Sequence, residues 1–234
     1  MAGFRARRAD LNRVASRPPA PPPLVVSEER GVRHLHVGGE AIQSAMRLAD
    51  PFALELDYTR CMMAFLLFHP DPRCALMIGL GGGSLAKFFH RNLPRLRTHA
   101  VEYDDRVIAT ARSLFHVPPD DARLVVEHGD GIEALAPECC DLLVVDGFED
   151  ESLPEALVSQ DFFDAAWGSL EEPGVLVMNC MDDDRGLDRN LRRLERAFDG
   201  AVLAFHALRD PNVVVLGLKG VPAELEWEIG RAHV

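Results

Sequence analysis

Residues 74–93 constrain the fold more than any other stretch of this chain. Residues 74–78 form a short, continuous apolar run, which is typical of a strand buried on both faces of a parallel sheet. Four glycines follow, and residues 84–93 then have the apolar periodicity of a helix that ends before Pro94. Glycines between a strand and a helix permit positive φ angles and let a ligand approach the free N–H groups of the first helical turn. The stretch therefore predicts a strand–turn–helix unit that can hold a ligand.

A second apolar run, at 98–101, is predicted to be the next strand, and Glu102 ends it. A carboxylate at this position can accept hydrogen bonds from both hydroxyls of a ribose. The glycine spacing is Gly-x-Gly-x-Gly, with Ser84 where a dinucleotide fingerprint has its third glycine. The glycines alone fit a bare turn equally well, but together with Glu102 they predict a nucleoside-binding site.

Composition excludes several classes of protein. The net charge of −12 argues against a nucleic-acid-binding face. No apolar run reaches the ~18 residues that cross a bilayer. The five cysteines have no metal-type spacing, and buried free thiols in a reducing cytosol are the simplest interpretation. We therefore expect a cytoplasmic protein without a metal, a nucleic-acid partner or a membrane partner, and we leave a homodimer open.

Four parts of the chain can be distinguished. Residues 1–23 are basic and then proline-rich, so we expect a disordered tail. Residues 24–50 contain short apolar runs separated by turn residues, and predict a small N-terminal β-hairpin unit with strands at 24–27, 32–37 and 41–45. Residues 51–227 form the main domain. Residues 228–234 read like the translation of a sequencing adapter, and we expect them to be a non-native tail.

Strand and helix patterns alternate along the main domain, which predicts a mostly parallel sheet with helices on both faces. Residues 202–207 and 213–218 are expected to close this sheet as an antiparallel pair. Helices are predicted at 52–68, 104–115, 132–135, 161–170 and 187–198, and the remaining strands at 123–127, 141–145 and 175–179.

Ligands bind to such sheets beyond the carboxyl ends of the strands. Four apolar runs end in a polar residue, namely Glu102, Asp130, Asp146 and Asn179. Because the carboxyl ends of parallel strands meet at one edge, we expect these side chains to line one site.

Several short motifs resemble those of the spermidine synthase (polyamine aminopropyltransferase) family. They are Ile-Gly-Leu-Gly-Gly-Gly-Ser-Leu at 78–85, Val-Glu-Tyr-Asp at 101–104, Gly-Asp-Gly at 129–131 and Val-Val-Asp-Gly-Phe-Glu at 144–149. The resemblance covers about 24–219 and is strongest to short bacterial spermidine synthase-like proteins, with Tyr-Thr-Arg-x-Met-Met at 58–63. It implies a Rossmann-like fold of the methyltransferase type, preceded by the hairpin unit.

The resemblance also implies roles for individual residues. The nucleoside would lie on the glycine turn, its ribose hydroxyls on Glu102 and its adenine amino group on Asp130. Gln43 would reach over from the hairpin unit, and the reacting amine would face two carboxylates. The implied nucleoside-binding set is Gln43, Gly79, Gly81, Gly83, Glu102, Asp130 and Gly131, and the implied catalytic pair is Asp146 and Glu149.

Three departures from the family pattern bear on the reaction. Gly82 stands where the family usually has an aspartate that contacts the donor's amine, Glu149 replaces the catalytic aspartate, and Thr59-Arg60 replaces a His-Glu pair. The expected activity is aminopropyl transfer from decarboxylated S-adenosylmethionine to a small-molecule amine such as putrescine. The missing acid at Gly82 keeps an S-adenosylmethionine-dependent methyltransferase as the alternative. A nucleoside-binding homologue without turnover is the second alternative.

Overall fold

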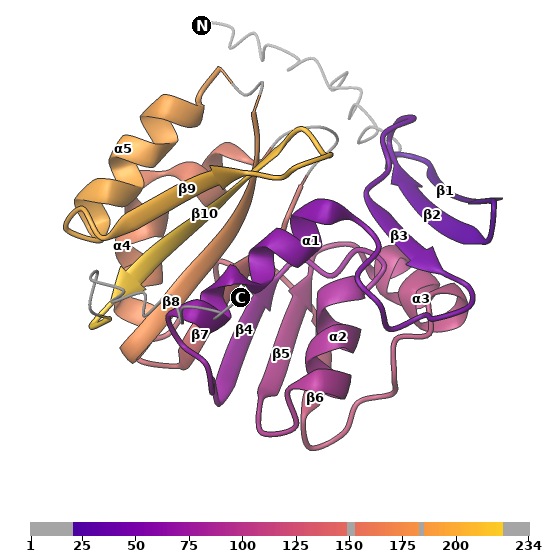
Figure 1. Cartoon of the computed structure of the whole chain (residues 1–234), viewed down its shortest axis with the longest axis horizontal. Coiled ribbons are helices and arrows are strands. Elements are labelled where there is room, and N and C mark those ends of the chain that lie inside the picture. The colour runs from indigo at the N-terminus through magenta and orange to yellow at the C-terminus, as the bar shows by residue number, and fades with distance from the viewer. Residues whose placement is uncertain (1–20, 149–152, 183–184, 222–234) are drawn as a thin grey trace, which may run out of the picture.

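The computed structural model describes residues 21–148, 153–182 and 185–221. These residues form a seven-stranded sheet in the order β6-β5-β4-β7-β8-β10-β9 and a separate three-stranded sheet (Figure 1). The large sheet contains β4 (Cys74–Ile78), β5 (Arg97–Glu102), β6 (Leu124–His128), β7 (Cys140–Val145), β8 (Leu170–Met181), β9 (Val202–His206) and β10 (Asn212–Lys219). Its first five strands are parallel, and β10 pairs antiparallel with both β8 and β9. The α/β fold predicted from the sequence is confirmed.

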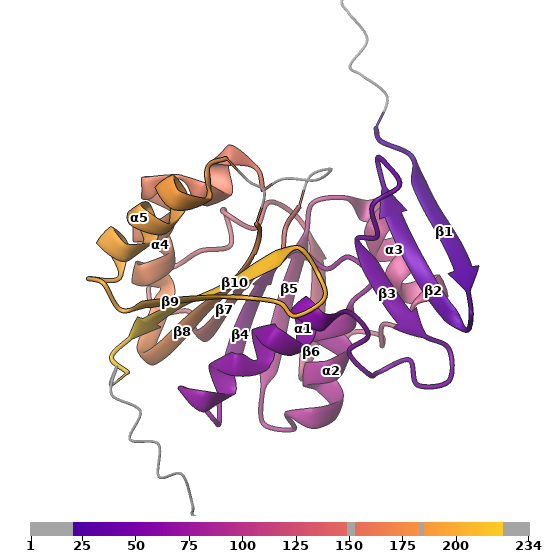
Figure 2. The same ribbon diagram turned by 45° about the horizontal axis from the view of Figure 1, so that its top comes forward.

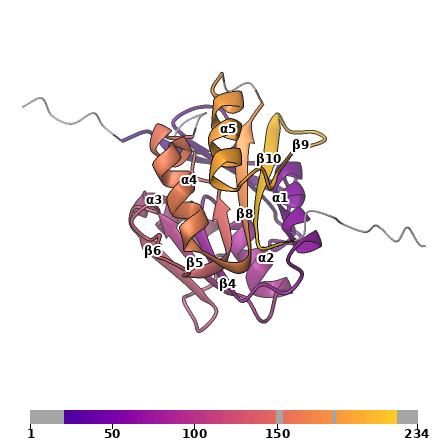
Figure 3. The same ribbon diagram turned by 90° about the vertical axis from the view of Figure 1, so that its left-hand side faces the viewer.

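Helices cover both faces of the large sheet. On one face lie α1 (Asp57–Met62), the 3₁₀ helix η1 (Met63–Leu67) and α2 (Ser84–Asn92). On the other lie α4 (Gln160–Ser169) and α5 (Leu187–Ala197), as Figure 3 shows from the side. The central strands β4 and β7 are buried on both faces, which is why their sequences are continuously apolar.

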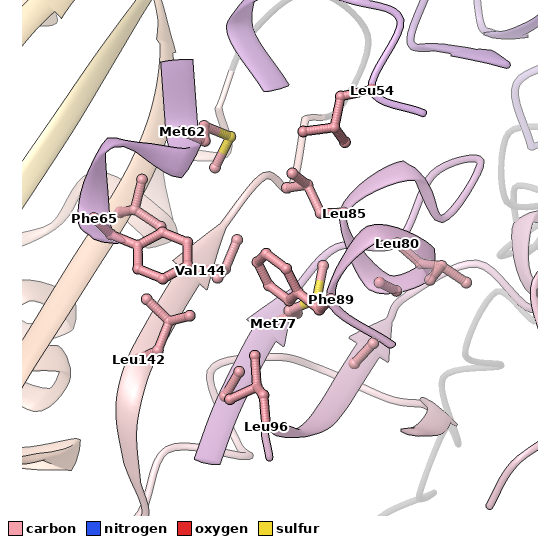
Figure 4. Packing of buried hydrophobic residues seen from close by; sticks show 14 of the residues in the cluster. Leu54, Met62, Phe65, Met77, Leu80, Leu85, Phe89, Leu96, Leu142 and Val144 are labelled. Atoms are coloured by element: carbon pink, nitrogen blue, oxygen red, sulfur yellow. The ribbon is translucent and has the colours of Figure 1, made fainter. Parts of the chain in front are cut away.

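The core on the α1–α2 side fixes the helix that follows the glycine turn. Phe65 and Phe89 meet edge to face with ring centroids 5.9 Å apart, and Leu142 and Val144 of β7 lie beneath them (Figure 4). Leu85 of α2 belongs to the same cluster. This packing holds the amino end of α2 at the end of β4, where the glycine turn must sit.

The small sheet consists of β1 (Leu24–Glu29), β2 (Val32–Val37) and β3 (Ser44–Arg47), paired antiparallel in sequence order. It lies beside α3 (Asp105–Leu114), as Figure 2 shows. Leu35 and Met46 of this sheet pack with Val107 and with Phe115, which caps α3. The sheet is therefore joined to the large domain, at α3, by its own small core.

Four predicted elements differ from the observed ones in type, or by three residues or more at one end. The predicted helix 52–68 begins only at Asp57, because Arg60 donates to the carbonyl oxygens of Leu54 and Glu55 and so stabilises an irregular segment before it. Residues 131–134 form hydrogen-bonded turns instead of a helix. Strand β8 begins five residues before its predicted start at 175, and the third hairpin strand occupies 44–47 instead of 41–45.

The predicted tails lie mostly outside the described residues. Only 21–23 of the tail 1–23 are described, and there Gly38 N donates to the carbonyl oxygen of Pro23. The whole of 228–234 lies outside them. In the described part of the chain, no helix combines the length and apolarity needed to span a bilayer.

Candidate functional site

A cavity of about 1550 Å³ opens at the carboxyl ends of the parallel strands. Its walls include the four polar residues that end apolar runs in the sequence: Glu102, Asp130, Asp146 and Asn179. The hairpin sheet closes one side through Gln43 and Ser44. The predicted convergence of the strand ends on one site is thus what the fold produces.

The glycine turn between β4 and α2 needs glycine for two different reasons. Gly79 and Gly81 line the cavity with φ angles of +94° and +52°. A Cβ on Gly79 would lie 2.3 Å from the carbonyl oxygen of Asp146, so the turn also needs glycine to approach the neighbouring strand. Gly83, with φ +70°, does not line the cavity, and a Cβ there would lie 2.2 Å from Val117.

Glu102 is held by the backbone of the turn. Its Oε2 accepts from the amides of Leu80 at 2.9 Å and Gly81 at 3.4 Å, and its Oε1 accepts from the amide of Asp104 at 3.1 Å. A carboxylate offers about four lone-pair sites, so Oε1 retains one that is not used by the described residues. Glu102 therefore organises the glycine turn and still presents an acceptor to the cavity.

Asp130 lines the cavity from the turn after β6. It is exposed, and its Oδ1 accepts from the amide of Ile132 at 2.9 Å, which leaves Oδ2 free of the turn. Gly131 packs so closely on Ile78 that a Cβ would lie 2.5 Å from the Cγ2 atom of that isoleucine. Both residues line the cavity.

Asp146 follows β7 directly and has two side-chain partners. Its Oδ1 accepts from Asn179 Nδ2 at 2.9 Å, and its Oδ2 accepts from the Tyr58 hydroxyl at 3.3 Å. Burial raises the pKa of Asp146, and the nearby Glu102 carboxylate adds to this, while the bonds from Asn179 and Tyr58 act in the opposite direction. Burial, followed by the Asp146 carboxylate, raises the pKa of Tyr58 well above its ordinary value, so this hydroxyl stays a donor.

Gln43 and Ser44 connect the hairpin sheet to the site in different ways. Gln43 Nε2 donates to the carbonyl oxygen of Phe148, 3.4 Å away in the loop after Asp146. Ser44 Oγ accepts from the amide of Gly82 at 2.8 Å. A Cβ on Gly82 would lie 2.9 Å from the Ser44 Cβ and 3.0 Å from the Phe115 ring. An aspartate at position 82 would therefore collide with the hairpin sheet in this arrangement.

Other residues of the site were not singled out by sequence reasoning. Asp210 lines the cavity and accepts from the amide of Tyr58 at 2.9 Å, and Asn212 donates to Asn179. Asp210 lies in the turn between β9 and β10 and Asn212 is the first residue of β10, where the only signal was the turn-forming Asp-Pro-Asn. Glu149, the second predicted catalytic residue, lies outside the described residues.

The cavity is strongly acidic. The charged residues that line it, among those described, are the acids Glu40, Glu102, Asp104, Asp105, Asp130, Asp146 and Asp210 and the base Arg106. Arg106 is already paired with Asp104. In the described residues, no group of three His, Cys, Asp or Glu side chains could hold a metal ion. The site is suited to a cationic ligand that carries its own hydrogen-bond donors.

The known proteins with similar sequences are polyamine aminopropyltransferases and, over a shorter part of the chain, methyltransferases. The chain is 37% identical over 214 residues to a polyamine aminopropyltransferase of Chromobacterium violaceum, covering 91% of this chain and 82% of that protein. It is 37% identical over 206 residues to a polyamine aminopropyltransferase of Neisseria meningitidis, covering 87% and 78%. A human eEF1A lysine and N-terminal methyltransferase is 32% identical over 153 residues, which is 57% of this chain but 22% of that protein. No family model matches the chain.

Solved structures agree on the fold. A probable spermidine synthase from Corynebacterium glutamicum superposes with a TM-score of 0.71 at 22% identity, covering 83% of this chain and 76% of that one. A spermidine synthase in complex with the transition-state analogue AdoDATO gives a TM-score of 0.64 at 19% identity, covering 85% and 74%. These likenesses establish the Rossmann-like architecture of the methyltransferase type.

Proposed function

The chain belongs to the polyamine aminopropyltransferase family, and from this premise we propose that it transfers an aminopropyl group from decarboxylated S-adenosylmethionine to a small diamine such as putrescine. It is a transferase of polyamine biosynthesis. The donor and the acceptor are the proposed part, and the cavity described above is the site that would take both.

The observation that carries this proposal is the charge of the cavity. Among the described residues, seven carboxylates line it against one arginine, and one of the seven, Asp104, already neutralises that arginine. The proposed donor has a sulfonium and an ammonium group and no carboxylate, and the acceptor is a dication. Intact S-adenosylmethionine would bring its own carboxylate into this negative field, which disfavours the methyltransferase alternative.

The residues present fit the nucleoside part of such a donor. Gly79 and Gly81 leave no Cβ between the turn and the cavity, so a ligand can lie directly on the backbone. Glu102 Oε1 has an acceptor site left for a ribose hydroxyl, and Asp130 Oδ2 is free to accept from an exocyclic amine. Gln43 would cover the ligand from the hairpin sheet, and Gly131 lets the turn that carries Asp130 pack closely on Ile78.

The donor supplies an electrophilic methylene next to a positively charged sulfur. In the transfer, the amine nitrogen forms a bond to this carbon, the carbon–sulfur bond breaks, and its electron pair remains on sulfur in methylthioadenosine. A protonated amine has no lone pair to attack with, so a carboxylate must take its proton. The amine and the methylene must also be held in line, since positioning is a large part of the rate enhancement.

Asp146 is the described residue best placed to receive that proton. It lies at the end of β7 on the cavity wall, and its raised pKa brings it closer to that of the amine it would deprotonate. Tyr58 and Asn179 hold both of its oxygens, so the carboxylate has a fixed orientation. The family resemblance implies Glu149 as the second catalytic carboxylate, in the place of the family's catalytic aspartate, so we propose that it shares in taking the proton; it lies outside the described residues.

Calorimetry with three ligands tests the proposal. Methylthioadenosine and decarboxylated S-adenosylmethionine should bind more tightly than intact S-adenosylmethionine, and purified protein should form methylthioadenosine when putrescine is added. Tighter binding of intact S-adenosylmethionine would favour methyl transfer. Binding of methylthioadenosine without turnover of any diamine would leave a nucleoside-binding protein.

A further inference from the structure

Two buried asparagines, Asn179 and Asn212, form a chain of hydrogen bonds that ends on the cavity carboxylate Asp146. Asn179 donates to Asp146 through Nδ2 at 2.9 Å, and its Oδ1 accepts from Asn212 Nδ2, also at 2.9 Å. Both asparagines are shielded from solvent, with exposed fractions of 2% and 8%. One chain of hydrogen bonds therefore runs from β10 through β8 to the carboxylate at the end of β7.

The direction of this chain fixes the orientation of the Asn179 amide. A side-chain amide donates at its nitrogen and accepts at its oxygen. With Asn179 Oδ1 bound to Asn212, the nitrogen is the end that faces Asp146. A turned-over amide would set its oxygen against the carboxylate and its nitrogen against another NH₂ group, so Asn212 opposes that rotation.

The pairing of the two strands makes this contact available. In the antiparallel register Asn179 lies opposite Val214, and Asn212 lies opposite Met181. Residues two apart on a strand share a face, so Asn212 is the diagonal neighbour of Asn179 on the same side of the sheet. A slip of one residue in this register would move Asn212 to the other face.

We propose that Asn212 is a positioning residue for the transfer reaction, which holds the Asn179 amide in the orientation that donates to Asp146. The inference rests on the proposed function, in which Asp146 receives the proton of the amine. Asn212 acts on the reaction through Asn179, because its amide nitrogen donates to Asn179 Oδ1 and, at 3.5 Å, to the sulfur of Met181, and not to Asp146 itself.

Loss of this positioning should change the pH dependence of the reaction. Burial raises the pKa of Asp146 and the bond from Asn179 opposes that increase, so losing the bond raises the pKa further. The other groups that act on Asp146 are the Tyr58 hydroxyl from α1 and the Glu102 carboxylate from β5, and Asp210 acts on Tyr58. All three remain unchanged when Asn212 is replaced.

The test is Asn212→Leu in the full-length chain. Leucine resembles asparagine in shape but has no donor, which leaves Asn179 Oδ1 buried without a partner. A hydrogen bond to a charged group is worth about ten- to a hundredfold, so kcat/KM for putrescine should fall by about that factor. The acid limb of the pH profile of kcat/KM should move to higher pH, while the affinity for methylthioadenosine stays within a few-fold of that of the unaltered chain.

Two further variants separate positioning from a general loss of stability. Asn179→Ala should shift the acid limb in the same direction, and Asn179→Ala with Asn212→Leu should lose little more, because both changes break one chain of contacts. Asn190→Leu is the matched control, since Asn190 is a buried asparagine of α5 that does not line the cavity. Its pH profile should equal that of the unaltered chain.

A measurement without turnover distinguishes failure of this inference from failure of the proposed function. ¹³C NMR titration of the Asp146 carboxyl, assigned with Asp146→Asn, reports the same change in pKa. A higher pKa of the Asp146 carboxyl in Asn212→Leu than in the unaltered chain supports the positioning role even if no diamine is consumed. Equal pKa values of Asp146 in the two proteins, or losses of kcat/KM that add up in the double variant, overturn it. If Asn212→Leu does not fold, Asn212→Ser removes the amide with a smaller change in volume and is judged by the same titration.

Discussion

Replacing Glu102 by glutamine separates the two tasks of its carboxylate. In the structure the two oxygens accept three backbone amides, from Leu80, Gly81 and Asp104, and so hold the glycine turn. In the proposed complex the acceptor site left on Oε1 also takes a ribose hydroxyl. Glu102→Gln keeps the shape and one acceptor oxygen, whereas Glu102→Ala removes both tasks.

The expected loss follows from the number of acceptors that remain. Hydrogen bonds to a charged group contribute about 1.5–3 kcal/mol, and bonds between neutral groups about 0.5–1.5 kcal/mol. In Glu102→Gln the ribose hydroxyl on the site of Oε1 meets an NH₂ group and loses its charged acceptor, so we expect methylthioadenosine to bind about 1.5–3 kcal/mol more weakly, or roughly 10–150-fold. Glu102→Ala should lose at least tenfold in affinity and also lower Tm, because the turn amides lose their partner.

Isothermal titration calorimetry with methylthioadenosine measures the first effect, and a thermal melt measures the second. Glu127→Gln is the matched control, since Glu127 is an exposed acid of the neighbouring strand β6 that contacts His99 and does not line the cavity. It should leave affinity unchanged. An affinity for folded Glu102→Gln within twofold of the unaltered chain would refute the ribose assignment and leave Glu102 as a structural residue of the turn.

Four further outcomes are expected. Because burial raises the pKa of Asp146, its carboxylate form is lost as pH falls through that raised pKa, and kcat/KM for putrescine should decline at a higher pH than an ordinary aspartate would give. Asp146→Asn should abolish this acid limb and lower the rate about 10²–10⁴-fold, and an unchanged pH–rate profile would contradict the role. Gln43→Ala should weaken methylthioadenosine binding a few-fold by calorimetry, because only one long bond of 3.4 Å ties it to Phe148; no change would show that Gln43 does not contact the nucleoside. Gly82→Asp should destabilise the fold by about 1–3 kcal/mol in urea unfolding, as overpacking does, and Ser44→Gly should relieve part of it; equal stability of Gly82→Asp would show that the turn moves freely. Glu149→Gln should lower turnover with putrescine if Glu149 takes part in proton transfer, and full activity would exclude that role.

The sequence determined the central part of the fold because that part is encoded locally. The continuous apolar run at 74–78 became β4 with the same bounds, and the acid at the end of β5 came to the cavity. A strand buried on both faces has a composition that no exposed element shares, and parallel strands must bring their carboxyl ends together. Glu102, Asp130 and Asp146 could therefore be assigned to one site without coordinates.

Elements whose boundaries depend on distant contacts were predicted less well. The segment before α1 has the composition of a helix, yet Arg60 ties its carbonyl groups into an irregular conformation until Asp57. Residues 132–135 were expected to be helical, but the Asp130 side chain accepts from the amide of Ile132. The amide of Leu135 donates to the carbonyl oxygen of Ile132, and the result is a series of turns. Local periodicity does not contain these competing hydrogen bonds.

The partners of the site residues were decided by tertiary structure alone. Asn179 was visible in the sequence as a polar strand end, but its connection to Asn212 depends on the antiparallel register of β8 and β10. From the sequence, Gly82 was interpreted as the loss of the family's aspartate. In the folded chain, Ser44 of the hairpin sheet lies so close to Gly82 that it leaves no room for a side chain there. Apolar patterning specifies which residues a strand buries, but the side chain that each polar group meets depends on how separate strands are paired and stacked, and that information is spread over the whole chain.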